Sequence, residues 1–222
     1  MKQVQDDIWE TETESPFPGL TTHAYLLTRT DGNVLFYNTG HHHEIERMAE
    51  LGGVAFQFLS HRDELGDTIN LLRERFGTQL GGPVREQAEF ARVRTPDILF
   101  EAREMLLGNI EVIPTPGHTP GSTCFLVDSP GGRHYLFTGD TLYLGEDGTW
   151  RPGLLPFSDR DALAESLETL RTLEPDVVFS SAFGGETGFQ EIRGRWSDHV
   201  AKALAALPPA PADRGTPGTV QE

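Results

Sequence analysis

The stretch that decides the fold is Thr115-Pro116-Gly117-His118-Thr119-Pro120-Gly121-Ser122, which directly follows a predicted strand at 109–114. Prolines and a glycine ahead of the histidine predict a stiff, sharp turn, because proline fixes φ and glycine tolerates backbone conformations closed to other residues. Stiffness lowers the entropy cost of holding His118 in one orientation. Taken alone, the segment leaves two interpretations open: a turn that carries a ligand, or a structural turn whose histidine is incidental.

On the N-terminal side of this turn, an apolar segment at 54–59 predicts a buried strand that runs into Ser60-His61-Arg62-Asp63. Side chains two residues apart on an extended strand end point the same way, so His61 and Asp63 can reach one metal ion. The alternative is a polar turn in which Asp63 or Asp67 caps the following helix.

On the C-terminal side, the apolar segment Tyr135–Phe137 leads into Thr138-Gly139-Asp140. Asp140 is therefore a third metal-capable side chain at the end of a strand, although an aspartate there can also accept hydrogen bonds from the amides of its own turn. His118 follows His61 by 57 residues and precedes Asp140 by 22. The three segments in this order indicate a metal site more strongly than any one of them.

The order His-x-Asp, Pro-Gly-His-Thr-Pro-Gly-Ser and Phe-Thr-Gly-Asp resembles the metallo-β-lactamase superfamily. Residues 31–40 are similar to the second strand and following turn of that family, and residues 158–179 to its late helix and strand, so the resemblance covers roughly residues 20–185. It implies an α/β (α+β) fold, a four-layer αβ/βα sandwich with metal between its two sheets. We expect one such domain over residues 1–206 and a disordered tail over 207–222, which is rich in Pro, Ala, Gly and Thr.

The chain departs from the family pattern at the first metal motif, which is His-x-His-x-Asp-His in the family. His61 is present, Asp63 replaces the second histidine, and the Asp-His pair falls on Leu65 and Gly66. The final histidine of the family is also missing from residues 180–185, and Asn38 stands where an aspartate is usual. The resemblance therefore implies a degenerate motif that has lost most ligands of the second metal.

Carried over by residue, the resemblance implies that His61, Asp63, His118 and Asp140 hold one divalent ion. Two histidines with carboxylates suit zinc, our first choice, and also iron or manganese. A carboxylate near the ion, Asp63, Asp67 or Asp140, can take the proton of the attacking water; Asp67 is our first choice for this catalytic role, or else it is an extra ligand. The run His41–His43 follows Gly40 and either supplies a further ligand, if its loop folds over the site, or is solvated.

The function implied by the resemblance is a mononuclear, metal-dependent hydrolase of an ester, lactone or thioester. Two alternatives stay open. The site is eroded and the chain is a non-catalytic binding or regulatory module, or His61, His118 and Asp140 hold iron(II) in a dioxygenase acting on a thiol or persulfide.

The acidic composition narrows the partners. A formal net charge of −16 and a pI of about 4.8 repel phosphate backbones, so we expect no nucleic-acid partner, and strongly anionic substrates are disfavoured unless a metal supplies positive charge. No apolar run approaches the ~20 residues that span a bilayer, and the N-terminus does not resemble a signal peptide. With one cysteine, Cys124, and therefore no internal disulfide, we expect a cytoplasmic protein with a small-molecule substrate and no membrane partner. A homodimer stays open.

The remaining sequence predicts alternating strands and helices. A hairpin is expected around Asp31-Gly32, because this dipeptide favours a tight turn between apolar strands. Further strands are expected at 109–114, 123–127 and 176–179, and helices at 44–51, 65–76, after Asp159 and at 196–207.

Overall fold

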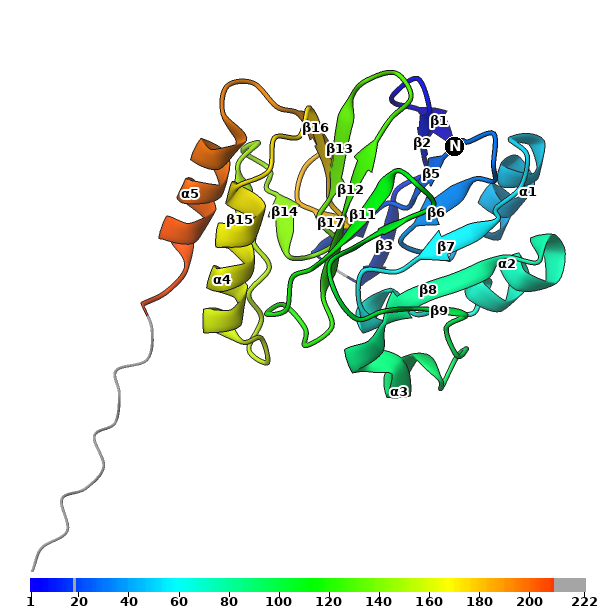
Figure 1. Ribbon diagram of the computed structural model, residues 1–222, viewed down its shortest axis with the longest axis horizontal. Coiled ribbons are helices and arrows are strands. Elements are labelled where there is room, and N and C mark those ends of the chain that lie inside the picture. Colours follow the sequence, from blue (N-terminus) through cyan, green and yellow to red (C-terminus); the bar gives the residue numbers. More distant parts are fainter. Residues whose placement is uncertain (18, 210–222) are drawn as a thin grey trace, which may run out of the picture.

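The computed structural model describes residues 1–17 and 19–209, and it places two large β-sheets between two groups of helices (Figure 1). The first sheet has the strand order β1-β2-β5-β6-β7-β8-β9 and is parallel from β6 to β9. Its strands are β1 Lys2–Gln3, β2 Ile8–Glu10, β5 Tyr25–Leu27, β6 Val34–Phe36, β7 Phe56–Phe58, β8 Gln79–Pro83 and β9 Ile98–Phe100.

The second sheet has the order β10-β11-β12-β13-β16-β18, and a smaller third sheet has the order β15-β14-β17-β4-β3. The strands of the second sheet are β10 Glu104–Leu106, β11 Ile110–Pro114, β12 Thr123–Asp128, β13 His134–Phe137, β16 Val177–Phe179 and β18 Phe189–Glu191. Those of the third are β3 Glu14–Phe17, β4 Leu20–Thr22, β14 Leu142–Leu144, β15 Trp150–Pro152 and β17 Ala182–Phe183.

Helices flank the two large sheets on opposite sides, which gives the expected four layers (Figure 1). On one side are α1 His42–Glu50, α2 Thr68–Phe76 and α3 Gln87–Phe90, and on the other are α4 Arg160–Arg171 and α5 Trp196–Ala206. Two short 3₁₀ turns, η1 Arg62–Glu64 and η2 Val84–Glu86, connect elements on the first side.

Aromatic side chains fill the space between the two large sheets. Phe36 and Phe58 of the first sheet lie against Phe125 and Phe137 of the second, and the Phe36 and Phe137 rings stack with centroids 3.9 Å apart. A second apolar cluster, which includes Leu163, Leu167 and Leu170, holds α4 and α5 against the other side of the second sheet. Strands buried on both faces explain why their sequences are apolar throughout and do not alternate with polar residues.

The predicted elements that surround the candidate ligands are confirmed, with boundaries shifted by a few residues. The hairpin pairs β5 with β6, and Asp159 caps α4 by accepting hydrogen bonds from two backbone amides. The expected helix at 65–76 begins later, at Thr68, because residues 62–64 form a 3₁₀ turn first. The capping alternative for Asp63 and Asp67 is wrong, since neither carboxylate caps α2.

The tail predicted over 207–222 lies mostly outside the described residues. Of its first residues, Leu207 is buried in the α4–α5 cluster and the Pro208 carbonyl accepts a hydrogen bond from Arg160. The packed chain therefore extends beyond residue 206. Among the helices that the structure describes, none combines the length and apolarity needed to cross a bilayer.

Candidate metal centre

His61 lies just beyond the C-terminal end of β7, where Ser60 and Glu64 fix its ring. The Glu64 carboxylate accepts hydrogen bonds from the Ser60 amide (2.7 Å) and from the Ser60 hydroxyl (2.5 Å), and it lies 3.3 Å from His61 Nδ1. The Ser60 hydroxyl, already a donor to Glu64, accepts from His61 Nδ1 at 2.9 Å. This arrangement assigns a proton to Nδ1 and directs Nε2 toward the cavity.

His118 is held by its proline- and glycine-rich turn, as the sequence predicts. Gly117 has φ +139°, and a Cβ there would collide with the backbone of Leu163 at the start of α4. The turn is therefore able to approach the helix only because residue 117 is glycine. His118 Nδ1 donates to the Gly153 carbonyl oxygen at 2.7 Å, so its Nε2 is the ring atom that faces the cavity.

Asp140 follows β13, and hydrogen bonds of Asp140 and its neighbour Gly139 connect this strand end to β17 and to the end of β6. Its Oδ1 accepts a hydrogen bond from the Ala182 amide (3.0 Å), and the preceding residue, Gly139, donates its amide to the Tyr37 hydroxyl (2.8 Å). Tyr37 has φ +68°, an uncommon conformation for a bulky residue that marks strain at the end of β6. The alternative interpretation is that Asp140 accepts hydrogen bonds from the amides of its own turn. Its Oδ1 instead accepts one from β17.

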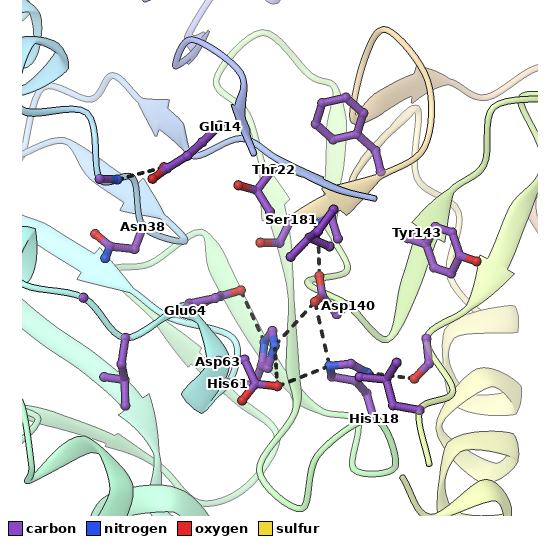
Figure 2. A pocket seen from close by; sticks show the side chains of 18 of the residues that line it. Glu14, Thr22, Asn38, His61, Asp63, Glu64, His118, Asp140, Tyr143 and Ser181 are labelled. Atoms are coloured by element: carbon purple, nitrogen blue, oxygen red, sulfur yellow. Dashed lines mark hydrogen bonds and ion pairs between the residues drawn. The ribbon is translucent and has the colours of Figure 1, made fainter. Parts of the chain in front are cut away.

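The four predicted ligands lie together at the floor of one cavity (Figure 2). Asp140 Oδ2 is 3.6 Å from His61 Nε2 and 3.7 Å from His118 Nε2, and Asp63 Oδ2 is 3.9 Å from each of the two nitrogens. Ligand atoms around one tetrahedral zinc ion are about 3.3 Å apart, given bond lengths near 2 Å. The separations of 3.6–3.9 Å between these four ligand atoms are therefore close to those that one ion requires.

The strongest indication of metal binding is that the Nε2 atoms of His61 and His118 are buried and have no hydrogen-bond partner among the described residues. His61 is 1% exposed and His118 is 3% exposed. A buried, unpaired polar atom costs about 1–3 kcal/mol. Two such atoms that face two carboxylates fit a divalent cation, and the donor set of nitrogen and oxygen suits zinc, iron or manganese.

The surroundings shift the pKa values of the two histidines in opposite directions. Burial by itself lowers the pKa of His61, but the carboxylates of Glu64, Asp140 and Asp63 outweigh it and raise the pKa to about 9. Burial, followed by repulsion from His61, lowers the pKa of His118. The carboxylates thus favour a positive charge at His61, the place where a cation would also be stabilised, so a proton and a cation compete for this cluster.

At the second metal position, where the family has more ligands, the side-chain oxygen of Asn38 is already engaged by neighbouring side chains. Asn38 Oδ1 accepts hydrogen bonds from Gln57 and from Thr68, each at 3.0 Å. Leu65 and Gly66 offer no donor atom, and a Cβ on Gly66 would lie 2.8 Å from Asn38 Nδ2. The ligands that the family pattern places at positions 65 and 66 are therefore missing, and Asn38 is held by its neighbours.

The cavity has a volume of about 1000 Å³ and is open to solvent. Asp67 lies on its wall at the start of α2, so its predicted role as a proton acceptor stays a prediction. Of the three consecutive histidines, only His42 lines the cavity, while His41 contacts the Thr13 carbonyl oxygen and His43 pairs with Glu12. None of the three joins the cluster of His61, Asp63 and His118.

Sequence reasoning missed the residues that orient the ligands. Glu64 sits inside the first motif, and a carboxylate three residues after His61 is a signal that could have identified it. Gly153 acts through its backbone carbonyl, and Tyr37 through a hydroxyl 102 residues from the amide it accepts. Neither of these contacts has a signal in sequence spacing.

Cys124 is buried beneath the ligand-bearing turns, as expected for a packed residue. Its sulfur is 3.2 Å from the Thr115 hydroxyl and 3.5 Å from the Thr138 carbonyl oxygen. Burial raises the pKa of the thiol to about 12. The thiol is therefore protonated at neutral pH and does not act as a nucleophile.

Comparisons with known proteins identify a matching family. The family described as "Metallo-beta-lactamase superfamily" matches residues 33–182. A hydroxyacylglutathione hydrolase from Albidiferax ferrireducens is 30% identical over 73% of this chain, and the match spans 62% of that protein, less than two thirds of its length. A hydroxyacylglutathione hydrolase from Anaeromyxobacter dehalogenans is 30% identical over 87% of this chain and 78% of its own.

Solved structures resemble the chain in fold. A metallo-beta-lactamase from Pontibacter korlensis has a TM-score of 0.70 and 16% identity, covering 93% of this chain and 97% of its own. A metallo-beta-lactamase family protein from Thermus thermophilus has a TM-score of 0.65 and 19% identity, covering 90% and 79%. At these identities the likeness concerns the fold alone.

Proposed function

The chain belongs to the metallo-β-lactamase superfamily, and from this premise we propose that it is a hydrolase that works with one divalent metal ion on an ester, lactone or thioester. The observation that carries the proposal is the pair of buried, unpaired Nε2 atoms of His61 and His118, which face Asp140 and Asp63 at the floor of an open cavity. The two relatives named hydroxyacylglutathione hydrolase support the thioester, because hydroxyacylglutathione is a thioester.

The ion would be held by His61, His118, Asp140 and Asp63, with zinc the first choice and iron or manganese next. Such an ion supplies a Lewis acid that polarises a carbonyl and lowers the pKa of water toward neutral. Glu64 and the Gly153 carbonyl hold the two imidazoles in the tautomer that presents Nε2. Asp67, whose carboxylate caps no helix, accepts the proton of the attacking water.

Two features bear on the alternative of an eroded, non-catalytic site. Packing of Phe183 into the second metal position and a helix-capping Asp63 would favour erosion. Instead Phe183 stacks on His23 with ring centroids 4.8 Å apart, and Asp63 Oδ2 faces both ligand histidines. These contacts favour a working site.

The second candidate function is an iron(II) dioxygenase that acts on a thiol or persulfide. It is favoured by the set of His61, His118 and Asp140, two histidines and one carboxylate around a common point. Its substrate would be oxidised and oxygen consumed, so an oxygen electrode separates it from a hydrolase.

The test is elemental analysis of protein expressed in the cytoplasm, where we propose that it works, without added metal, followed by hydrolase assays on the same preparation. We expect about one zinc, iron or manganese per chain. Protein that is purified without metal and also takes up none of the three from solution would contradict the proposal. Iron together with oxygen consumption would instead support the dioxygenase.

A further inference from the structure

The charges that line the cavity have one sign. Five carboxylates line it, and no lysine or arginine does so among the described residues. The five are Glu14, Asp63, Glu64, Asp67 and Asp140. Figure 2 shows four of them on two sides of the cavity, with Glu14 on the wall opposite the ligand cluster.

The cationic side chain next to His61 in the sequence, Arg62, is already surrounded by carboxylates. Its guanidinium packs 5.9 Å from the centre of the Phe157 ring. Its nitrogen atoms lie 3.7–3.9 Å from carboxylate oxygens of Asp63, Glu86 and Glu89. A bound anion would have to displace these partners to reach Arg62, so this side chain offers little attraction to a negative substrate.

One stretch of the rim is apolar and exposed. Leu155 is 43% exposed and Phe157 is 59% exposed, and with Leu154 they line the cavity next to His118. Large apolar side chains left in water at the mouth of a cavity indicate a place for an apolar part of a ligand. We call Leu154, Leu155 and Phe157 the apolar rim.

A divalent ion does not reverse the sign of the cavity. It offsets two of the five negative charges, and a metal-bound His61 is neutral, so a net negative charge remains. The potential in a cleft of one sign is strengthened by its low-dielectric walls. Hydroxyacylglutathione, the substrate in the name of the two relatives, carries two carboxylates and one ammonium and is an anion.

We propose that this cavity selects uncharged or cationic esters and thioesters with an apolar chain seated on the apolar rim, and that it discriminates against anionic ones such as hydroxyacylglutathione. The proposal rests on the hydrolase function above. In the reaction, water attacks the carbonyl carbon, the bond to the leaving oxygen or sulfur breaks, and that atom takes up a proton as the acid is released. The anionic acid formed is then repelled by the same carboxylates.

The experiment compares thioesters of one acyl group, butyryl, with small thiols of different charge. The thiols are N-acetylcysteamine (neutral), 2-(dimethylamino)ethanethiol (cationic) and 3-mercaptopropionate (anionic), with S-lactoylglutathione as a fourth substrate. We expect kcat/KM for the anionic thioesters to be lower by about tenfold, the effect of one unfavourable charge pair about 10 Å apart at an effective dielectric near 20. The difference should narrow at high salt.

A binding measurement keeps this inference separate from the hydrolase proposal. The S-butyl thioethers of the same thiols cannot be hydrolysed, and their affinities for metal-free and metal-loaded protein are measured by calorimetry. We expect the same order, with the anionic thioether weakest. If no thioester or ester is hydrolysed, the proposed function fails, and the order of thioether affinities still decides this inference.

A charge-changing variant of the rim sharpens the test. Leu155→Lys should raise kcat/KM for the anionic thioester and lower it for the cationic one, each about threefold to tenfold. Leu155→Gln controls for the lost apolar contact, and Met105→Lys, at an exposed apolar position remote from the cavity, controls for net charge. Equal or faster hydrolysis of anionic thioesters by the unaltered protein, or tighter binding of the anionic thioether, overturns the inference.

Discussion

The cavity floor has two halves, one at the candidate ligands and one at the second metal position of the family. Both contain polar side chains, but these differ in whether they have hydrogen-bond partners. In the ligand half, His61 and His118 each leave a buried Nε2 without a partner. In the opposite half, Asn38 Oδ1 accepts two hydrogen bonds, from Gln57 and Thr68. The comparison teaches that the two positions differ at the ligand-type atom itself: Asn38 Oδ1 is already engaged by its neighbours, whereas the two Nε2 atoms have no protein partner among the described residues and face carboxylates.

The largest effect is expected from removal of a ligand in the first half. His118→Ala deletes one of the two unpaired nitrogens, and we expect the metal content to fall from about one ion per chain to less than about 0.1, with loss of hydrolysis. Elemental analysis after gel filtration measures it. His42→Ala, at a histidine that lines the cavity outside the cluster, should keep its metal. A His118→Ala protein that still binds about one ion per chain would show that the unpaired Nε2 of His118 is not a metal ligand.

Removal of a supporting carboxylate should have a smaller effect. Glu64→Gln weakens the hold on His61 Nδ1 without touching the ligand atoms, and we expect zinc affinity to fall about 10- to 100-fold. Competition with a chromophoric chelator measures the affinity. Glu89→Gln, at a carboxylate that pairs with Arg62 on the outer side, is the matched control. Equal affinities for the two variants would show that Glu64 does not orient His61.

Metal affinity should also rise with pH. His61 has a pKa of about 9 in the metal-free protein, so below that pH it must lose a proton before its Nε2 can bind an ion. Between pH 7 and 9 we expect affinity to rise by up to about tenfold per pH unit and to level off above 9. Calorimetry in buffers of different ionisation enthalpy counts the released proton. A flat profile would remove His61 from the site.

Restoring a family ligand in the opposite half should have the smallest effect. Gly66→His places a Cβ 2.8 Å from Asn38 Nδ2, and Asn38 cannot move freely because its Oδ1 is bonded twice. We expect a fall in Tm of about 5 °C and no second ion per chain. Gly66→Ala, which adds the Cβ alone, should lower Tm similarly. Two ions bound by Gly66→His would show that this half had kept its metal-binding geometry.

Different parts of the molecule were predictable from sequence to different degrees. The turn around His118 was predictable because prolines and Gly117 restrict the local backbone, and such restrictions are written residue by residue. The region 79–106 was not predicted: β8 contains Gly81 and Gly82, whose missing side chains make room for the rings of Phe100 and Phe90. That packing depends on contacts distant in sequence, which periodicity does not record.

The site shows the same division. The ligand atoms of His61, His118 and Asp140 follow strand ends and are recognisable by spacing, and the structure brings them within 3.6–3.7 Å of one another in histidine–aspartate pairs. The Gly153 carbonyl and the Tyr37 hydroxyl, which hold these groups in place, come from other strands. A backbone carbonyl is present in every residue, so no pattern of residue types could single out Gly153.

The buried thiol of Cys124 can report local opening of the segments that carry the candidate ligands. It is the single cysteine, it is fully buried, and it lies between the turn of Thr115 and the strand that leads to Asp140. A thiol reagent reacts with Cys124 only when these elements separate. The labelling rate therefore measures how often the ligand-bearing loops open. A cation that bridges the loops slows those excursions by mass action, and the slowing reads out its occupancy without any substrate.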